Sequence, residues 1–183
     1  MPRDLPSNLS APFVPPSLAH HSITLANWSI TTHARLVVGA LVFRRHAPSC
    51  PPQILLVKRA STDSFPNFWE VPGGSVDSSD KTLLDAVVRE VWEETGLLVK
   101  GFVQQVWDAN EGSIEVEFLG RRGERWCKLN FIVEVEDGEV TLDAEEHQDW
   151  GWFEKGEIEG LDFVSKQGIE IVMNGFRAFE ARK

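Results

Sequence analysis

The first half of the chain alternates apolar runs with short segments rich in turn-forming residues. Residues 35–45 (RLVVGALVFRR) form a β-branched apolar run that is typical of a buried strand. Residues 53–60 (QILLVKRA) have the same character, and the HAPSCPP segment between the two runs is typical of a turn, so the pair predicts a β-hairpin. Residues 68–74 (FWEVPGG) predict a short strand that ends at a pair of glycines.

Two other segments repeat their apolar residues at the spacing of a helix. Residues 82–96 (TLLDAVVREVWEETG) predict a helix that stops at Gly96, with Ser79 or Asp80 as its N-cap. Residues 165–182 predict a closing amphipathic helix. The apolar stripes consist of Leu84, Val88 and Val91 in the first helix, and of Ile169, Val172, Met173 and Phe176 in the second.

The remaining apolar segments have the composition of strands. They are residues 25–33, 97–109, 113–119 and 128–137, and a strand end followed by a turn is expected over 151–161. Strands and helices therefore mix without a strict βαβ alternation. This order predicts an α/β protein with a mixed sheet packed between helices.

The chain divides into an N-terminal extension, residues 1–34, and one domain, residues 35–183. The first 20 residues are rich in Pro and Ser and lack periodicity, so we expect an arm or loose extension there. A chain of 183 residues, of which 42% are hydrophobic, is long and apolar enough for one domain with a real core. No pattern in the extension assigns it a role.

Composition narrows the class of partner. The formal net charge of -10 argues against polymeric nucleic acid and anionic membranes, because both bind to basic surfaces. A small phosphorylated substrate stays compatible with this charge, because a divalent cation can bridge two anions. The two cysteines indicate neither a zinc site nor a disulfide framework. Since the chain shows no apolar run of membrane length and no signal pattern, we expect a cytoplasmic protein.

Three glutamates lie close together on the first predicted helix. Successive helical residues are rotated by about 100°, so Glu94 lies about 40° from Glu90, and Glu93 about 60° to its other side. Like charges at this spacing repel each other, unless a hard divalent cation such as Mg²⁺ or Mn²⁺ binds between them. Arg89 can hold one of the carboxylates through paired hydrogen bonds. A solvated acidic helix face is the alternative interpretation.

The segment WEVPGGSVDSSDKTLLDAVVREVWEETGL resembles the Nudix hydrolase family, whose members are MutT-like proteins. The family signature is Gly, five residues, Glu, seven residues, then Arg-Glu-aliphatic-any-Glu-Glu-any-Gly-aliphatic, and residues 89–97 match its second half fully. The first half departs from it. Lys81 stands where the signature glutamate belongs, six residues separate it from Gly74, and Asp80 lies one place earlier as a substitute acid.

The resemblance implies an α/β/α sandwich and a metal-dependent hydrolase of the diphosphate linkage in a nucleoside diphosphate derivative or related organic pyrophosphate. It implies that Glu93 and Glu94 are ligands of Mg²⁺ or Mn²⁺, and that the carbonyl of Gly73 is a further ligand. Glu90 is then a ligand or the general base, oriented by Arg89. Family members often dimerise, so a homodimer is an open expectation.

Other residues are candidates for the same site. DAEEHQDWGWF (143–153) is a second acidic cluster, in which Glu145 is a candidate for base or metal function and Glu146 for a substrate contact. We expect His147 to be a hydrogen-bonded loop histidine in preference to a ligand. Arg59 is either a phosphate contact or a surface residue. Trp69 either stacks on the substrate or belongs to the core.

Two other functions are compatible with this sequence. The chain is either a non-catalytic ligand-binding module on the same fold, or a lyase or isomerase that uses the same metal. The intact Glu90, Glu93 and Glu94 favour hydrolysis over the binding module. The substrate itself stays open among an oxidised nucleoside triphosphate, a dinucleotide, a nucleotide sugar and a non-nucleotide diphosphate.

Overall fold

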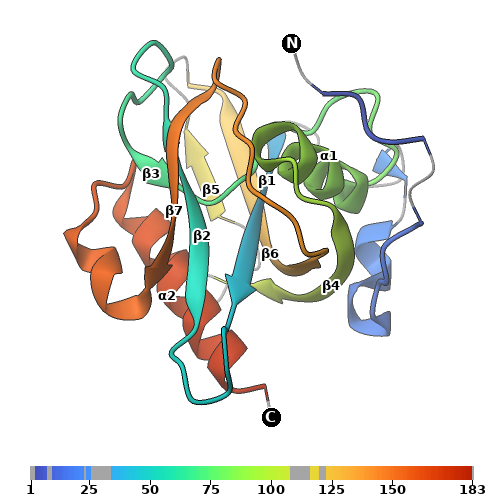
Figure 1. The fold of residues 1–183 in the computed structure, drawn as a ribbon. Coiled ribbons are helices and arrows are strands. Elements are labelled where there is room, and N and C mark those ends of the chain that lie inside the picture. Colours follow the sequence, from blue (N-terminus) through green and yellow to red (C-terminus); the bar gives the residue numbers. More distant parts are fainter. Residues whose placement is uncertain are drawn as a thin grey trace.

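The computed structural model describes residues 3–7, 10–22, 24–25, 34–107, 116–119 and 123–182, and Figure 1 shows how its elements are arranged. The elements in chain order are the short 3₁₀ helix η1 (Pro16–Ser22), the strands β1 (Ala34–Arg44), β2 (Gln53–Arg59) and β3 (Trp69–Glu70), the helix α1 (Leu83–Thr95), the strands β4 (Val99–Val106), β5 (Val116–Leu119), β6 (Arg125–Val135) and β7 (His147–Glu154), the 3₁₀ helix η3 (Lys155–Gly160), and the helix α2 (Lys166–Glu180). The predicted strand over residues 25–33 lies, apart from Leu25, outside the described residues.

The strands form one mixed sheet around the long strand β1. Its order is β3-β2-β1-β6-β4, with β5 paired to β6 and β7 paired to β2. β1 runs parallel to β6 and antiparallel to β2, with which it forms the predicted hairpin. Because β7 also pairs with β2, the segment that opens β7 reaches the same side of the molecule as β3.

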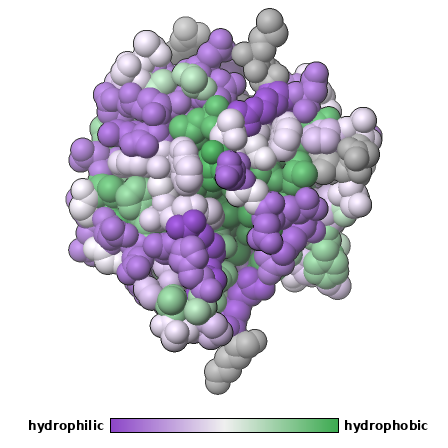
Figure 2. Space-filling view, in the orientation of Figure 1, coloured by the Kyte–Doolittle hydropathy of each residue, from purple (hydrophilic) through white to green (hydrophobic). Residues whose placement is uncertain are grey.

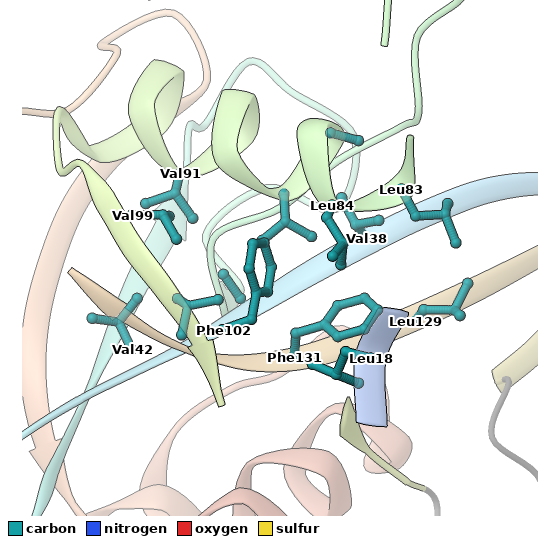
Figure 3. Packing of buried hydrophobic residues seen from close by; sticks show 14 of the residues in the cluster. Leu18, Val38, Val42, Leu83, Leu84, Val91, Val99, Phe102, Leu129 and Phe131 are labelled. Carbon is teal, nitrogen blue, oxygen red and sulfur yellow. The ribbon is translucent and has the colours of Figure 1, made fainter. Parts of the chain in front are cut away.

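One helix packs against each face of this sheet, which confirms the predicted α/β sandwich (Figure 1). Alternate residues of β1 separate the two cores, since Val38 and Val42 contact the α1 side and Leu41 the α2 side. Figure 3 shows the core beneath α1, where Leu84 and Val91 point toward the sheet. Hydrophilic residues cover most of the face in Figure 2, and hydrophobic ones appear between them. None of the helices that the structure describes is both long and apolar enough to span a membrane.

The described part of the extension packs against the domain, which differs from the loose arm expected from its composition. We call residues 3–7, 10–22 and 24–25 the N-terminal strap. Leu18 is 3% exposed within the core beneath α1 (Figure 3), and Phe13 pairs through its backbone with Gly101 in β4. Trp92 Nε1 in α1 donates a hydrogen bond to the carbonyl of Asp4 (3.0 Å). Individual apolar anchors thus hold a segment whose sequence lacks periodicity.

Candidate functional site

Helix α1 is fixed at both ends and buried on two sides. Its N-cap is Thr82, whose hydroxyl accepts from Asp85 in a capping box, so the N-cap predicted at Ser79 or Asp80 is wrong. Gly96 ends the helix in the left-handed conformation, as predicted. Besides the apolar face toward the core, Glu90 and Glu94 are only 7% and 4% exposed. This burial excludes the solvated acidic face as an interpretation of these two glutamates.

The loop after β3 brings its backbone against both buried carboxylates. Gly73 N donates a hydrogen bond to Glu94 Oε2 (2.8 Å), and Gly73 has a φ of 151°. A Cβ at Gly73 would lie 2.2 Å from the carbonyl oxygen of Val38, and one at Gly74 would lie 2.8 Å from the Glu90 carboxylate. Both glycines of the predicted pair are therefore required by close packing between the loop, β1 and α1.

Arg89 binds three carboxylates through its guanidinium group and so fixes their positions. Its Nε and Nη2 donate to the two oxygens of Asp80 (3.0 and 2.9 Å), and its Nη1 lies 2.8 Å from both Glu90 Oε1 and Glu93 Oε2. Nη2 also donates to the carbonyl of Ser75 (2.9 Å). Burial alone would lower the pKa of Arg89, but its carboxylate partners raise it, so the guanidinium stays charged.

Asp80 binds Arg89 from one position before the place that the family signature gives to a glutamate. Its side chain is buried against Arg89, whereas Lys81 is exposed. A turn aims Asp80, because its Oδ2 accepts from Asp77 N (2.8 Å) and its own N donates to the carbonyl of Asp77 (3.1 Å). The turn of residues 77–80 thus accommodates the extra loop residue before the helix begins, and Asp80 still binds Arg89.

Burial shifts the acid equilibria of the cluster in different directions. Burial raises the pKa of Glu90 to about 7, against the opposing charge of Arg89. Burial, reinforced by the charges of Glu70 and Glu90, raises the pKa of Glu94 well above its ordinary range. Burial also acts to raise the pKa of Glu70, but neighbouring His147, with Lys128 and Arg59, lowers it overall. The site therefore holds one stable carboxylate beside two that are costly to ionise without a cation.

His147 begins β7 and lies inside this cluster, not in a loop. It is 2% exposed, and neither ring nitrogen has a hydrogen-bond partner in the described part of the chain, so the prediction of a hydrogen-bonded loop histidine is wrong. Its Nε2 lies 3.6 Å from Glu70 Oε1 and 3.9 Å from Glu94 Oε1, both beyond a normal hydrogen bond. Ligand atoms of Glu94, Glu146 and His147 all lie within 4.8 Å of one another.

The cluster opens into a cleft of about 1170 Å³. Acidic side chains of α1 and of the loop before β7 line one part of it, and apolar side chains line another. The apolar part includes Trp69, Trp126, Phe163, Val164 and Ile171. A cleft with both kinds of lining can take a charged group together with a planar or apolar one.

The family model for the NUDIX domain matches residues 33–171. The chain belongs to the Nudix family. The sheet, the glutamate helix α1 and the glycine-bearing loop lie within this matched range, and α2 begins in it, as the resemblance of the signature segment implied.

Several known Nudix proteins resemble this chain in sequence or in structure, to different extents. The chain is 54% identical over 50 residues to the "m7GpppN-mRNA hydrolase NUDT17" of Danio rerio, which covers 27% of this chain and 16% of that protein. It is 24% identical over 149 residues to the "RNA pyrophosphohydrolase" of Bartonella clarridgeiae, covering 74% and 84%. The MutT NUDIX hydrolase structure from Burkholderia pseudomallei has a TM-score of 0.55 and 24% identity, and the match covers 75% of this chain and 95% of that one.

The remaining predicted site residues of this Nudix domain lie along the cleft. Arg59 lines it but is bound by Glu70 and Asp63, so its guanidinium already has anionic partners. Trp69 lines it and also packs edge-on against Phe153, with ring centroids 4.9 Å apart. Glu145 and Glu146 line the cleft and are exposed.

Three residues at the cleft were missed by sequence reasoning. Glu70 in β3 was read only as part of a strand. Lys128 and Asn130 lie on the face of β6 that meets Gly39 of β1, where a Cβ would lie 2.4 Å from Asn130 Oδ1. Asn130 is 2% exposed, and its Oδ1 has no hydrogen-bond partner among the described residues. The sequence contained a signal for Lys128 and Asn130, since these polar residues alternate with apolar ones along β6, a strand that is otherwise buried.

The residues present fit the divalent cation that Nudix proteins generally use. Glu94 and Glu146 offer carboxylate oxygens, and the orphaned nitrogens of His147 lie beside them. A cation here would also remove the cost of keeping Glu90 and Glu94 ionised in a buried place. The donor set and its surroundings therefore suit a divalent cation.

Proposed function

We propose that this Nudix domain is a divalent-metal-dependent hydrolase that cleaves the diphosphate linkage of a nucleoside diphosphate derivative or related organic pyrophosphate. One observation carries the proposal. Arg89 holds Asp80, Glu90 and Glu93 together beside the buried Glu94, at the acidic part of a cleft whose other part is apolar. Such an arrangement suits a substrate with a charged diphosphate and an organic group.

The carboxylates take different roles in this proposal. Glu93 and Glu94 hold the cation together with the carbonyl of Gly73, and Glu146 is a further oxygen donor near Glu94. When bound, Mg²⁺ or Mn²⁺ neutralises the diphosphate and lowers the pKa of a coordinated water. Glu90, with a pKa of about 7, can accept a proton near neutral pH, and Arg89 fixes its carboxylate for that task.

Substrate binding falls to the rest of the cleft. Lys128 lines the cleft together with Glu70, and its positive charge helps to lower the pKa of that carboxyl. Its ammonium can therefore also contact a substrate phosphate. The unpartnered oxygen of Asn130 can accept a hydrogen bond from an N–H group of the organic part. Trp69 and Trp126 offer flat surfaces at the apolar part of the same cleft.

The relatives guide the choice of substrates to test. Their printed names describe hydrolysis of m7GpppN-mRNA and pyrophosphohydrolysis of RNA. A net charge of -10 disfavours a long RNA but not a short capped or triphosphorylated 5′ end. We therefore expect turnover of nucleotide-sized substrates, with little gain when the RNA is lengthened.

A substrate panel tests the proposal. Purified protein is incubated with Mg²⁺ or Mn²⁺ and with nucleoside triphosphates, ADP-ribose, dinucleoside polyphosphates, a cap dinucleotide, and short and long 5′-triphosphate RNAs. Product phosphates and nucleotides are separated and quantified. We expect turnover of at least one class, and a loss of about 100-fold or more in Glu93→Gln, because a metal ligand is removed. Glu159→Gln, an exposed glutamate in η3, is the matched control.

Two results would count against the proposal. Unchanged turnover in Glu93→Gln would remove α1 from the chemistry. Tight binding of a panel member by calorimetry, with no turnover in either metal, would favour a non-catalytic ligand-binding module on the same fold.

A further inference from the structure

We infer that His147 is a metal ligand, so that the cation of this Nudix domain is held by nitrogen as well as oxygen and is Mn²⁺ or a later transition metal in preference to Mg²⁺. The inference rests on the proposed function, because it concerns the cation of the same site.

The first ground is that the imidazole is buried without a partner. At 2% exposure, with neither Nδ1 nor Nε2 bonded to any described residue, His147 lacks the hydrogen bonds that buried polar groups almost always have. A buried polar group without a partner is costly, so a ligand that occupies one nitrogen would remove a standing cost. Among the described residues, Asn130 also has such an atom, but it does not belong to the group of side chains able to hold a cation.

The second ground is the spacing of the surrounding donors. Glu94 Oε1 lies 3.9 Å from His147 Nε2, and a ligand atom of Glu146 completes the group within 4.8 Å. Donors around one cation lie roughly 3–4 Å apart, because each ligand bond is about 2.0–2.2 Å long. Glu94 Oε1 and His147 Nε2 are thus too far apart to bond to one another and lie at the spacing of two ligands of one ion, with the Glu146 carboxylate within 4.8 Å of both.

The third ground is that two of the donors, Glu94 and His147, are held in place by other parts of the fold. Glu94 uses Oε2 to accept from Gly73 N, which leaves Oε1 for His147 and the ion. His147 N donates to the carbonyl of Asp143 (2.9 Å), and the same residue pairs with Arg59 across β2 and β7. The imidazole therefore sits at a fixed strand end and not on a mobile tip.

The chemical consequence is selectivity. Imidazole nitrogen suits transition metals such as Fe²⁺, Ni²⁺ and Zn²⁺, and Mn²⁺ accepts it more readily than Mg²⁺, which prefers oxygen donors and retained water. Without a nitrogen ligand, the carboxylates alone would prefer Mn²⁺ over Mg²⁺ less strongly, as expected of a site with only oxygen donors. The competing arrangement is a protonated imidazolium between Glu70 and Glu94, in which the ring binds no ion.

Electron spin-echo spectroscopy of bound Mn²⁺ separates the two arrangements. The wild-type protein, stripped with a chelator and titrated with Mn²⁺, should give a spectrum with ¹⁴N modulation from a directly bound imidazole. Labelling histidine with ¹⁵N should replace that modulation by the ¹⁵N pattern. A Mn²⁺ spectrum without nitrogen coupling in the wild-type protein would overturn the inference, without reliance on any variant.

Variants provide the second readout. In His147→Gln the Mn²⁺ affinity, measured by the loss of free-ion signal, should fall by about 10-fold or more, while the Mg²⁺ affinity changes by less than about 3-fold. His46→Gln, which changes an exposed histidine in the β1–β2 turn, should leave both affinities unchanged. Circular dichroism checks that the His147 variant is folded. Equal losses for Mn²⁺ and Mg²⁺ in a folded variant would count against nitrogen ligation.

These outcomes are independent of catalysis. Turnover with Mg²⁺ but no nitrogen coupling would sustain the proposed hydrolase and remove His147 from the metal. Nitrogen coupling with no turnover of any panel member would sustain the ligand and remove the hydrolase.

Discussion

Two buried histidines mark two regions of this protein that are built in opposite ways. His21 belongs to the N-terminal strap, where its Nε2 lies 2.9 Å from the side-chain oxygen of Gln105 and its ring packs edge-on against Phe131. His147 lies among Glu70, Glu94 and Glu146, with no such neutral partner among the described residues. The first region closes the core, whereas the second keeps polar groups buried for a ligand to satisfy.

The comparison teaches where stability is gained and where it is given up. The strap adds apolar burial beneath α1, through residues such as Leu18. The carboxylate cluster does the reverse, because burial raises the pKa of Glu90 and Glu94 and so opposes their ionisation. A region that costs stability in this way is typical of a site preserved for binding or catalysis.

The largest expected effect separates activity from stability. Glu94→Gln should lower kcat/KM by about 10³-fold, because a metal-binding carboxylate is lost. The same change should raise the free energy of unfolding by about 0.5–2 kcal/mol in metal-free buffer, since the cost of burying an ionisable carboxylate disappears. Steady-state kinetics and urea denaturation measure the two quantities. A destabilised variant would show that Glu94 supports the fold, and the contrast between the regions would fail. Glu159→Gln is the control for both.

The strap should show the opposite behaviour. Leu18→Ala removes a side chain that is 3% exposed beneath α1 and should lower the free energy of unfolding by about 2–4 kcal/mol. Its kcat/KM at low temperature should stay within about 2-fold of wild type, because Leu18 does not line the cleft. Leu5→Ala, which changes a partly exposed strap residue, is the control. A stability loss below about 0.5 kcal/mol would mean that the strap is not part of the core.

The role of the acid at Asp80 is tested by removing it and then placing a glutamate at position 81. Asp80→Ala removes the paired hydrogen bonds to Arg89 and should lower kcat/KM by about 10- to 100-fold, because Glu90 and Glu93 lose their fixed positions. Adding Lys81→Glu restores the family's seven-residue interval between the acid and Arg89. We expect no rescue, because position 81 points to solvent in this loop. Recovery to within about 3-fold of wild-type activity would show that the loop can rearrange.

Sequence reasoning found the parts of the site that lie on one element. The helix at 83–95, its stop at Gly96 and the shared face of Glu90 and Glu94 follow from periodicity and helical geometry. The glycine pair was found because its position before the helix fits the family signature. The helix start was misjudged because Asp77 and Asp80 form their own turn before Thr82 caps the helix.

Residues from separate elements escaped prediction for a physical reason. Glu70 and His147 come together only after β2 pairs with both β3 and β7, and Asn130 reaches the same cleft as Glu70 through the pairing of β1 with β6. No local pattern encodes those pairings. The strap escaped because its contacts come from single anchors, such as Leu18 and His21, in a segment without periodicity. The substrate is equally hidden, since it depends on the joint shape of the cleft.

The smallest expected effect concerns pH, where the two regions should act with opposite signs. Burial lowers the pKa of His21 to about 4, so neutral His21 leaves stability unchanged above pH 6.5 and the group costs more stability as the pH falls toward 4. Burial raises the pKa of Glu90 to about 7, so this group costs stability above pH 7, and the cost disappears as the pH falls toward 4.5. Each contribution amounts to about 1–2 kcal/mol between pH 7 and 5.

Because the two windows overlap, each variant should reveal the contribution that the other group hides. Free energies of unfolding are measured from pH 7.5 to 4.5 with a chelator present, so that no cation changes the acid equilibria. Relative to wild type, His21→Gln should gain stability as the pH falls, because the unfavourable uptake of a proton by His21 is gone. Glu90→Gln should lose its advantage over wild type as the pH falls, because wild-type Glu90 then becomes neutral as well. If the free energies of unfolding of the two variants, relative to wild type, changed with pH in the same direction, the pKa values of His21 and Glu90 would not be shifted in the opposite directions expected from their surroundings.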